Sequence, residues 1–293
     1  MKKLKIFLSM LLVLISVFQC ALVSNAATPY ANYFLVDKGS YMPTPAAYEV
    51  LGTLNLSMTD IGSLNAAKDM YLINVEDTDA DGNTIYYTRI YVADTDNNRI
   101  VVLTNAPLDK STDDRDLYIS NGFRVDFVIE GDKDDKSDPS TLNGPSGIYV
   151  DENGTVIVAD TRNFRLVEFT GRGNFRYAYA APESEMLGDD FSFQPLKVVK
   201  DDRGYIYVTS IGDYHGILLL NSNGEFSSYY GANSVTLSFW ESLVKTFWSR
   251  EDTRGTIVKL PYTFQNIFAS DDGYIYATTA GTSSGQLRKI NSA

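Results

Sequence analysis

A short pattern recurs along the chain, and it limits the possible folds more than any other feature of the sequence. Each copy contains a short apolar segment, a turn of the type Asp-x-x-Gly or Asp-Asp-Gly, a segment rich in Tyr, Val and Ile, a polar turn and another apolar segment. The glycines that close these turns are Gly154, Gly204 and Gly273, and a more distorted copy covers residues 90–103. Glycine suits a hairpin turn because it accepts a positive φ angle. Short runs of β-branched and aromatic residues between turns predict antiparallel β-meanders.

The copy around Gly204 continues through Asn223-Gly224 into a further strand over residues 225–230, so that one unit contains four strands. Four-stranded antiparallel units that follow one another in the sequence are the blades of a β-propeller. The predicted fold is therefore all-β, a β-propeller of four-stranded antiparallel blades. We expect about five blades to be visible.

The interval from Gly204 to Gly273 is longer than a blade of about 40–50 residues, which indicates an insertion. Ser238 and Glu241 form a capping-box pattern. Apolar residues then recur with helical spacing, namely Trp240, Leu243, Val244, Phe247 and Trp248. We predict one inserted amphipathic helix over residues 238–250. Its apolar face packs on the propeller or, alternatively, docks on a partner or a membrane surface.

Two segments share the pattern Val-Ala-Asp-Thr-x-Asn-x-Arg, at residues 92–99 and 158–165. Upstream of the second copy lies the sequence Pro145-Ser-Gly-Ile. These motifs resemble the NHL repeat, and the chain resembles secreted bacterial NHL-repeat β-propeller proteins. The resemblance covers most of residues 67–293 but is close in these two copies only. It implies six blades.

The N-terminus has the pattern of a secretory signal peptide over residues 1–26. Lys2, Lys3 and Lys5 precede an apolar run at 6–18, and a small-residue cleavage pattern ends at Ala26. We therefore expect a secreted, extracellular protein, cleaved near Ala26, with no transmembrane segment after signal removal.

The mature chain is expected to have two parts. Residues 27–66 hold N-terminal strands, near 33–36 and 47–56, that close or start the ring, and residues 67–293 hold the NHL-like blades. The sequence stops just after a third strand at 287–290. An exposed sheet edge there is unfavourable. We therefore expect that an N-terminal strand completes the last blade, or that the sequence is truncated at its C-terminus or forms an open ring.

Composition excludes several classes of function. The formal net charge is −12, which argues against a nucleic-acid partner because phosphate binding needs a basic face. The chain has one His, which disfavours His-rich metal centres. Its one Cys lies in the signal segment, so the mature chain has no disulfide and no Cys nucleophile.

The repeated charged residues of the Ala-Asp-Thr turns are Asp94 with Arg99 and Asp160 with Arg165. Because they recur with the turn, we interpret them as structural residues that hold it through side-chain to backbone bonds and a short ion pair.

A separate acidic segment contains Asp77, Asp79 and Asp81, followed by Gly82. Carboxylates at alternate positions before a glycine match the first half of a calcium-binding loop. The twelfth position is Thr88 rather than Glu, so the bidentate ligand of such a loop is missing. The segment is either a weak structural calcium site or a solvated hairpin tip.

No Gly-x-Ser-x-Gly motif, phosphate-binding loop or spacing typical of a catalytic triad occurs in the sequence. The favoured function is a non-catalytic binding scaffold for a protein, peptide or glycan at the cell envelope, with no required cofactor and Ca²⁺ as a candidate ligand. The alternative, which the family resemblance implies, is a metal-dependent enzyme of the lactonase or lyase type with a site in the central channel. An assembly protein is a third hypothesis.

Overall fold

The computed structural model describes residues 33–37, 40–43, 53–79, 81–107, 122–132, 134–135, 137–188, 191–231, 263–270, 272–279 and 287–291. The chain divides into two compact units, residues 1–53 and 54–293. In the first unit, β1 (Tyr33–Asp37) and β2 (Ser40–Pro43) form an antiparallel hairpin. Within the described residues the secondary structure consists of β-strands and short 3₁₀ turns.

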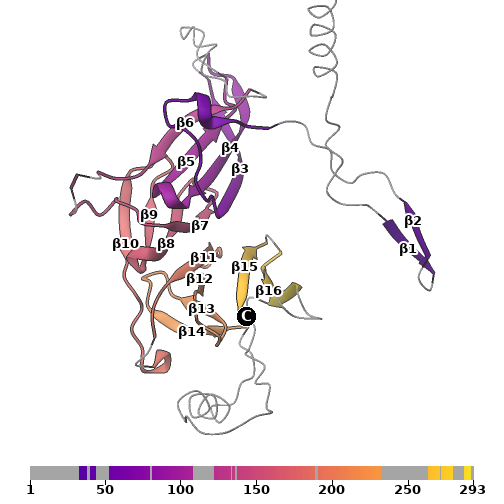
Figure 1. Ribbon diagram of the computed structural model, residues 1–293, viewed down its shortest axis with the longest axis vertical. Coiled ribbons are helices and arrows are strands. Elements are labelled where there is room, and N and C mark those ends of the chain that lie inside the picture. The colour runs from indigo at the N-terminus through magenta and orange to yellow at the C-terminus, as the bar shows by residue number, and fades with distance from the viewer. Residues whose placement is uncertain are drawn as a thin grey trace, which may run out of the picture. The chain divides into compact units, whose positions relative to one another are not determined.

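The second unit contains four antiparallel sheets, each built from strands in sequence order (Figure 1). Blade 1 consists of β3 (Asp69–Thr78), β4 (Thr84–Asp94), β5 (Arg99–Thr104) and β6 (Arg124–Ile129). Blade 2 consists of β7 (Pro145–Val150), β8 (Val156–Asp160), β9 (Arg165–Phe169) and β10 (Phe175–Tyr179). Blade 3 consists of β11 (Pro195–Lys200), β12 (Ile206–Ser210), β13 (Ile217–Leu220) and β14 (Phe226–Tyr230). Blade 4 contains β15 (Phe264–Ala269), β16 (Tyr274–Thr279) and β17 (Leu287–Asn291).

The first strand of each blade contacts the first strand of the next, from β3 through β7 and β11 to β15. A side chain of β11 also reaches β3, because the Lys197 Nζ atom lies 2.6 Å from the Asp69 Oδ1 atom. The first strands of blades 1 and 3 therefore approach each other across blade 2. This convergence of first strands is the arrangement of a β-propeller.

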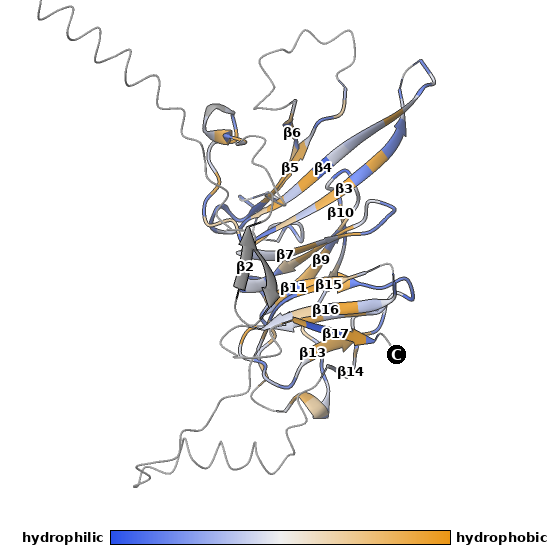
Figure 2. Cartoon of the chain, turned by 90° about the vertical axis from the view of Figure 1, so that its right-hand side faces the viewer, coloured by the Kyte–Doolittle hydropathy of each residue, from blue (hydrophilic) through white to orange (hydrophobic). Residues whose placement is uncertain are grey.

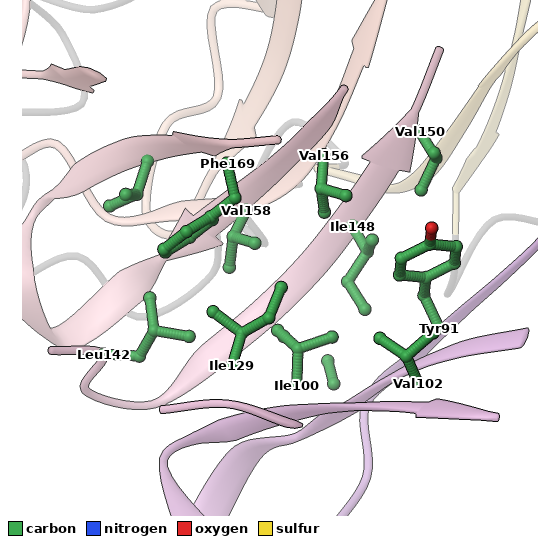
Figure 3. Close-up of a cluster of buried hydrophobic side chains, with 12 residues drawn as sticks. Tyr91, Ile100, Val102, Ile129, Leu142, Ile148, Val150, Val156, Val158 and Phe169 are labelled. Carbon is green, nitrogen blue, oxygen red and sulfur yellow. The ribbon is translucent and has the colours of Figure 1, made fainter. Parts of the chain in front are cut away.

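The hydrophobic core lies between successive blades. Between blades 1 and 2 the cluster includes Tyr91, Ile100, Ile148, Val158 and Phe169, all of them buried (Figure 3). The neighbouring positions of β8 face the other way, and Ile157 and Ala159 pack into the core between blades 2 and 3. A third cluster joins blades 3 and 4. Because side chains alternate along a strand, each central blade buries both of its faces, which explains its nearly continuous apolar strands.

The predicted fold class is confirmed, since the described chain is all-β and its sheets are propeller blades. The described residues contain four blades rather than the expected five, and three strands of the fourth. The predicted helix at 238–250, with Trp240, Leu243, Val244, Phe247 and Trp248, lies outside the described residues. So does the signal segment at 1–26.

The segment before blade 1 differs from the expectation of a strand that ends at residue 56. The chain instead forms a 3₁₀ turn, η1 (Leu56–Met58), because the Asn55 side chain accepts a hydrogen bond from the Ser57 amide. Leu54, Leu56, Ile61 and Leu64 then pack against blade 1 without joining its sheet. Among the described residues, no helix is both long and apolar enough to cross a membrane.

Candidate functional site

The Ala-Asp-Thr turn of blade 2 follows β8 and forms the 3₁₀ turn η4 (Thr161–Asn163). The fully buried Asp160 side chain accepts three hydrogen bonds: from the Asn143 amide at 2.7 Å, and from the Asn163 Nδ2 and Arg165 Nε atoms at 2.8 Å each. Arg165 also donates to the Thr141 carbonyl. The turn therefore anchors the loop at residues 141–143, which leads into β7, the first strand of the same blade.

The turn of blade 1 repeats these contacts almost atom for atom. Asp94 accepts from the Asn65 amide, the Asn97 Nδ2 atom and the Arg99 Nε atom, the last at 2.7 Å. Arg99 donates to the carbonyls of Ile61 and Ser63. The structure thus brings together both Asp and Arg pairs that the sequence singled out, at the turn between the second and third strands of each blade.

A threonine in each turn reaches the next blade. The Thr95 hydroxyl donates to the Pro145 carbonyl at 2.7 Å, and the Thr161 hydroxyl donates to the Pro195 carbonyl at 2.6 Å. All four residues are buried, and Pro145 and Pro195 are the first residues of the innermost strands β7 and β11. The pKa of Asp160 is raised, because the effect of burial exceeds that of the hydrogen bonds from Asn143 and Arg165, which lower it. These turns are therefore structural connections between blades, and their fully buried Asp94 and Asp160 carboxylates are not open to a ligand.

The starts of the innermost strands form a second polar cluster. The largely buried Lys197 donates to the Lys68 carbonyl and pairs with Asp69, whose other carboxylate oxygen accepts from the Ile148 amide of blade 2. The ammonium group of Lys197 thus neutralises the Asp69 carboxylate at this end of the propeller axis. Within the described part of the chain, no group of three or more His, Cys, Asp or Glu residues could hold a metal ion.

Asp77 lies near the end of β3, and Asp79 and Asp81 lie in the turn between β3 and β4. Asp79 accepts hydrogen bonds from the amides of Asp81 and Asn83 and from the Asn83 side chain, which lower its pKa. Asp77 faces the Tyr87 hydroxyl at 3.3 Å. The carboxylate of Asp79 therefore stabilises the turn, and calcium binding at this tip stays a prediction.

An open groove lies between this hairpin and blade 2. Its volume is about 1180 Å³. One wall is β3 from Tyr71 to Asp77, with Tyr87 and Arg89 of β4, and the other wall is formed by two turns of blade 2, at residues 150–154 and 170–174. The groove exists because β3 and β4 contain 10 and 11 residues, whereas β7 and β8 contain 6 and 5. Figure 2 shows the β3–β4 hairpin extending beyond the neighbouring strands.

Side-chain contacts hold the β4 part of the first wall, Tyr87 and Arg89, in place. Arg89 pairs with Asp126 at 2.9 Å and lies over the rings of Tyr87 and Phe127. Burial disfavours the charge of Arg89, but the Asp126 carboxylate and the nearby tyrosines more than offset this effect and raise the pKa of Arg89. Burial also raises the pKa of Tyr87, so its hydroxyl stays neutral at physiological pH.

The walls of the groove carry mainly acidic and amide groups. The carboxylates are Glu76, Asp77, Asp151 and Glu152; the amides are Asn74, Asn153 and Asn174; and Arg172 is the cation of the blade 2 wall. Sequence reasoning missed this groove. The signal that indicates it is the length of the first hairpin, which exceeds that of the later copies.

A model of the NHL repeat matches residues 142–169. No curated protein matches the chain. Three solved structures illustrate the similarity at the level of structure. A streptogramin B lyase is 13% identical, with 74% of this chain and 61% of that chain covered and a TM-score of 0.36. Virginiamycin B lyase from Staphylococcus aureus is 12% identical, with coverage of 78% and 68% and a TM-score of 0.37.

The third structure is PorZ, a surface component of the type-IX secretion system of Porphyromonas gingivalis, which is 12% identical with a TM-score of 0.41. The match covers 79% of this chain and 26% of PorZ. The chain thus spans less than two thirds of the streptogramin B lyase and about a quarter of PorZ. The activities in these names belong to those proteins.

The repeat that the family model matches runs from the connection before β7 to the end of β9, and it contains the turn centred on Asp160. Its counterpart in blade 1 makes the same hydrogen bonds. The four blades and this repeat show a β-propeller that contains an NHL repeat at residues 142–169.

Proposed function

We propose that the protein is a non-catalytic binding scaffold and that the groove between blades 1 and 2 holds its ligand, a protein segment, a peptide or a glycan. The observation that supports this proposal is the groove itself, an open cavity whose walls come from two blades and carry carboxylates, amides and tyrosines. Such side chains bind by hydrogen bonds and by contact with ring faces, as in other ligand sites with a few well-placed polar groups.

The groove is suited to binding because hydrogen bonds within its blade 2 wall form its shape without a ligand. The turn at 150–154 is closed by Asp151, whose side chain accepts from the amides of Asn153 and Thr155. The turn at 170–174 is closed by a hydrogen bond between the Thr170 amide and the Asn174 carbonyl. A preformed site loses less conformational entropy when it binds.

We also propose that the protein acts outside the plasma membrane, at the cell envelope. This part rests on the signal-peptide pattern of residues 1–26 alone. Detection of the mature N-terminus near residue 27 in a culture supernatant or envelope fraction supports it, and retention of residues 1–26 on a cytoplasmic protein contradicts it.

The binding proposal is tested with a double variant of the groove, Glu152→Gln with Arg172→Gln, against the remote exposed control Glu183→Gln. The ligands are N-acetylglucosamine oligosaccharides and a library of synthetic decapeptides, and calorimetry gives the affinity. We expect at least one ligand to bind the wild type and the control equally and the groove variant at least tenfold more weakly. Binding that the groove variant leaves unchanged contradicts the proposal.

The same preparations separate the scaffold from the metal-dependent enzyme of the alternative hypothesis. Lactone hydrolysis is measured with and without added Ca²⁺ or Mn²⁺. The scaffold predicts no turnover above the protein-free rate in either condition. Metal-dependent turnover that purifies with the protein overturns the non-catalytic assignment.

A further inference from the structure

The innermost strand of blade 1 has one free edge. In its sheet β3 pairs with β4 and with no other strand among the described residues. Beyond Tyr71 the strand runs past the shorter strands of blade 2 and forms a wall of the groove. A free edge presents backbone N–H and C=O groups that another extended chain can pair with.

The pairing register shows which residues of β3 face this edge. The Thr88 amide donates to the Asn105 side chain, and the Thr88 carbonyl accepts from the Asn105 amide, so the backbone of Thr88 faces β5. Backbone groups alternate sides along a strand, so those of Tyr87 and Arg89 face β3. Their register partners, Val75 and Ile73, therefore face β4.

It follows that Leu72, Asn74 and Glu76 direct their backbone N–H and C=O groups away from β4, toward the free edge. Residues of both orientations, from Tyr71 to Asp77, line the same groove. A groove over one face of the strand would be lined by every second residue only, because the side chains of alternate residues point to opposite faces. The groove therefore runs along the backbone edge of the strand, over a length of about 20 Å at 3.4 Å per residue.

We infer that β3 binds an extended peptide of a partner protein as an added β-strand, with Leu72, Asn74 and Glu76 supplying the backbone hydrogen bonds. This inference rests on the proposed binding function and specifies its ligand. β-Strand addition draws affinity from main-chain hydrogen bonds and specificity from alternate side chains. β3 contains neither proline nor lysine, two residues that often protect an edge strand from pairing.

The charge of the groove indicates the composition of the peptide. Four carboxylates, Glu76, Asp77, Asp151 and Glu152, face one wall cation, Arg172, since Arg89 is already paired with Asp126. The chain as a whole carries a net charge of −12. A peptide with Lys or Arg at alternate positions complements this surface. Apolar residues at other positions suit the exposed Met70 and Leu72 of β3.

The probe is a synthetic ten-residue peptide of alternating Val and Thr with two Thr positions replaced by Lys, labelled for fluorescence anisotropy. Two control peptides replace Lys by Glu or carry N-methyl groups on alternate amides. We expect the Lys peptide to bind with a Kd in the micromolar to submillimolar range. The Glu peptide and the N-methylated peptide are each expected to bind at least tenfold more weakly.

The decisive pair of variants is Asn74→Pro and Asn74→Ala. Both lose the hydrogen bond from the Thr88 hydroxyl to the Asn74 side chain. Only proline also removes the outward N–H group, and an edge strand tolerates proline where the N–H faces away from its partner. We expect Asn74→Ala to bind the Lys peptide like the wild type and Asn74→Pro at least tenfold more weakly, with equal circular dichroism spectra. Glu76→Pro against Glu76→Ala repeats the comparison nearer the tip.

Each other outcome overturns the inference. If both proline variants bind like their alanine controls, or if the wild type binds none of the peptides, strand addition is wrong. If Asn74→Pro instead abolishes a concentration-dependent dimer in sedimentation, the edge pairs with a second copy of the chain. If proline has no effect but Glu152→Gln with Arg172→Gln abolishes binding, the groove function stands and the strand-addition inference fails.

Discussion

Replacement of Asp160 by alanine is the most informative perturbation of the repeat, because this carboxylate is fully buried and accepts three hydrogen bonds. Asp160→Ala leaves Arg165, whose side chain is 20% exposed, with its hydrogen bond to the Thr141 carbonyl but without its ion pair. Removal of one partner from a buried ion pair costs about 3–5 kcal/mol. Because Arg165 keeps some contact with water, we expect about 3 kcal/mol, the lower end of this range.

The matched control is Asp96→Ala, in the equivalent turn of blade 1. Asp96 pairs with Arg162 of blade 2 at 2.8 Å, the same distance as in the buried pair, but the two side chains are 41% and 51% exposed. Exposed ion pairs contribute about 0.2–1 kcal/mol. The two variants therefore remove ion pairs of equal length that differ in burial.

Urea unfolding followed by circular dichroism measures both changes, provided that the slope of the free energy of unfolding against urea stays constant. We expect Asp160→Ala to lower the free energy of unfolding by at least 2 kcal/mol more than Asp96→Ala, on the order of the difference between buried and exposed pairs. Equal effects below about 1 kcal/mol would refute the reasoning that the buried Asp160–Arg165 pair stabilises its blade.

Three further predictions concern the blades and the hairpin tip. Gly147→Ala places a Cβ atom 2.5 Å from the Leu196 carbonyl oxygen. We therefore expect urea unfolding to show a free energy of unfolding lower by about 1–3 kcal/mol. An unchanged free energy of unfolding contradicts the close approach of β7 and β11. Asn83→Ala should move the pKa of Asp79 up toward 3.8 in an NMR titration, because hydrogen bonds from Asn83 hold it below that value. An Asp79 pKa that does not move in this variant rules out the role of Asn83. Since the pKa of Asp79 is lowered in the folded state, its contribution to stability is complete above about pH 4 and is lost as the pH falls through the folded pKa. Millimolar calcium should raise the melting temperature of the wild type but not of Asp81→Asn, and a melting temperature indifferent to calcium and chelator removes the calcium site.

The blades could be predicted from the sequence because their signals are local. Each Asp-x-x-Gly hairpin is written in a few consecutive residues, and the turn that begins at Asp160 repeats the one that begins at Asp94. Within each turn the Asp and Arg partners lie five residues apart in the sequence.

The groove and the axial ion pair could not be predicted, because both depend on distant segments. Lys197 and Asp69 meet only when blades 1 and 3 are placed around one axis. The groove requires the turns at 150–154 and 170–174 to lie beside β3, which no local pattern encodes. The expected strand near 47–56 does not include residues 53–56, because the Asn55 side chain caps a 3₁₀ turn there, and residues 47–52 lie outside the described residues.

The convergence of non-adjacent blades is tested most directly by a double-mutant cycle of Asp69→Asn and Lys197→Met. These residues belong to blades 1 and 3, and their charged atoms lie 2.6 Å apart. If the innermost strands surround one axis, the two substitutions are coupled, and we expect an interaction energy of about 1–3 kcal/mol in urea unfolding. Effects that add within about 0.5 kcal/mol would show that the two side chains do not meet, and would contradict the propeller arrangement on which the groove depends.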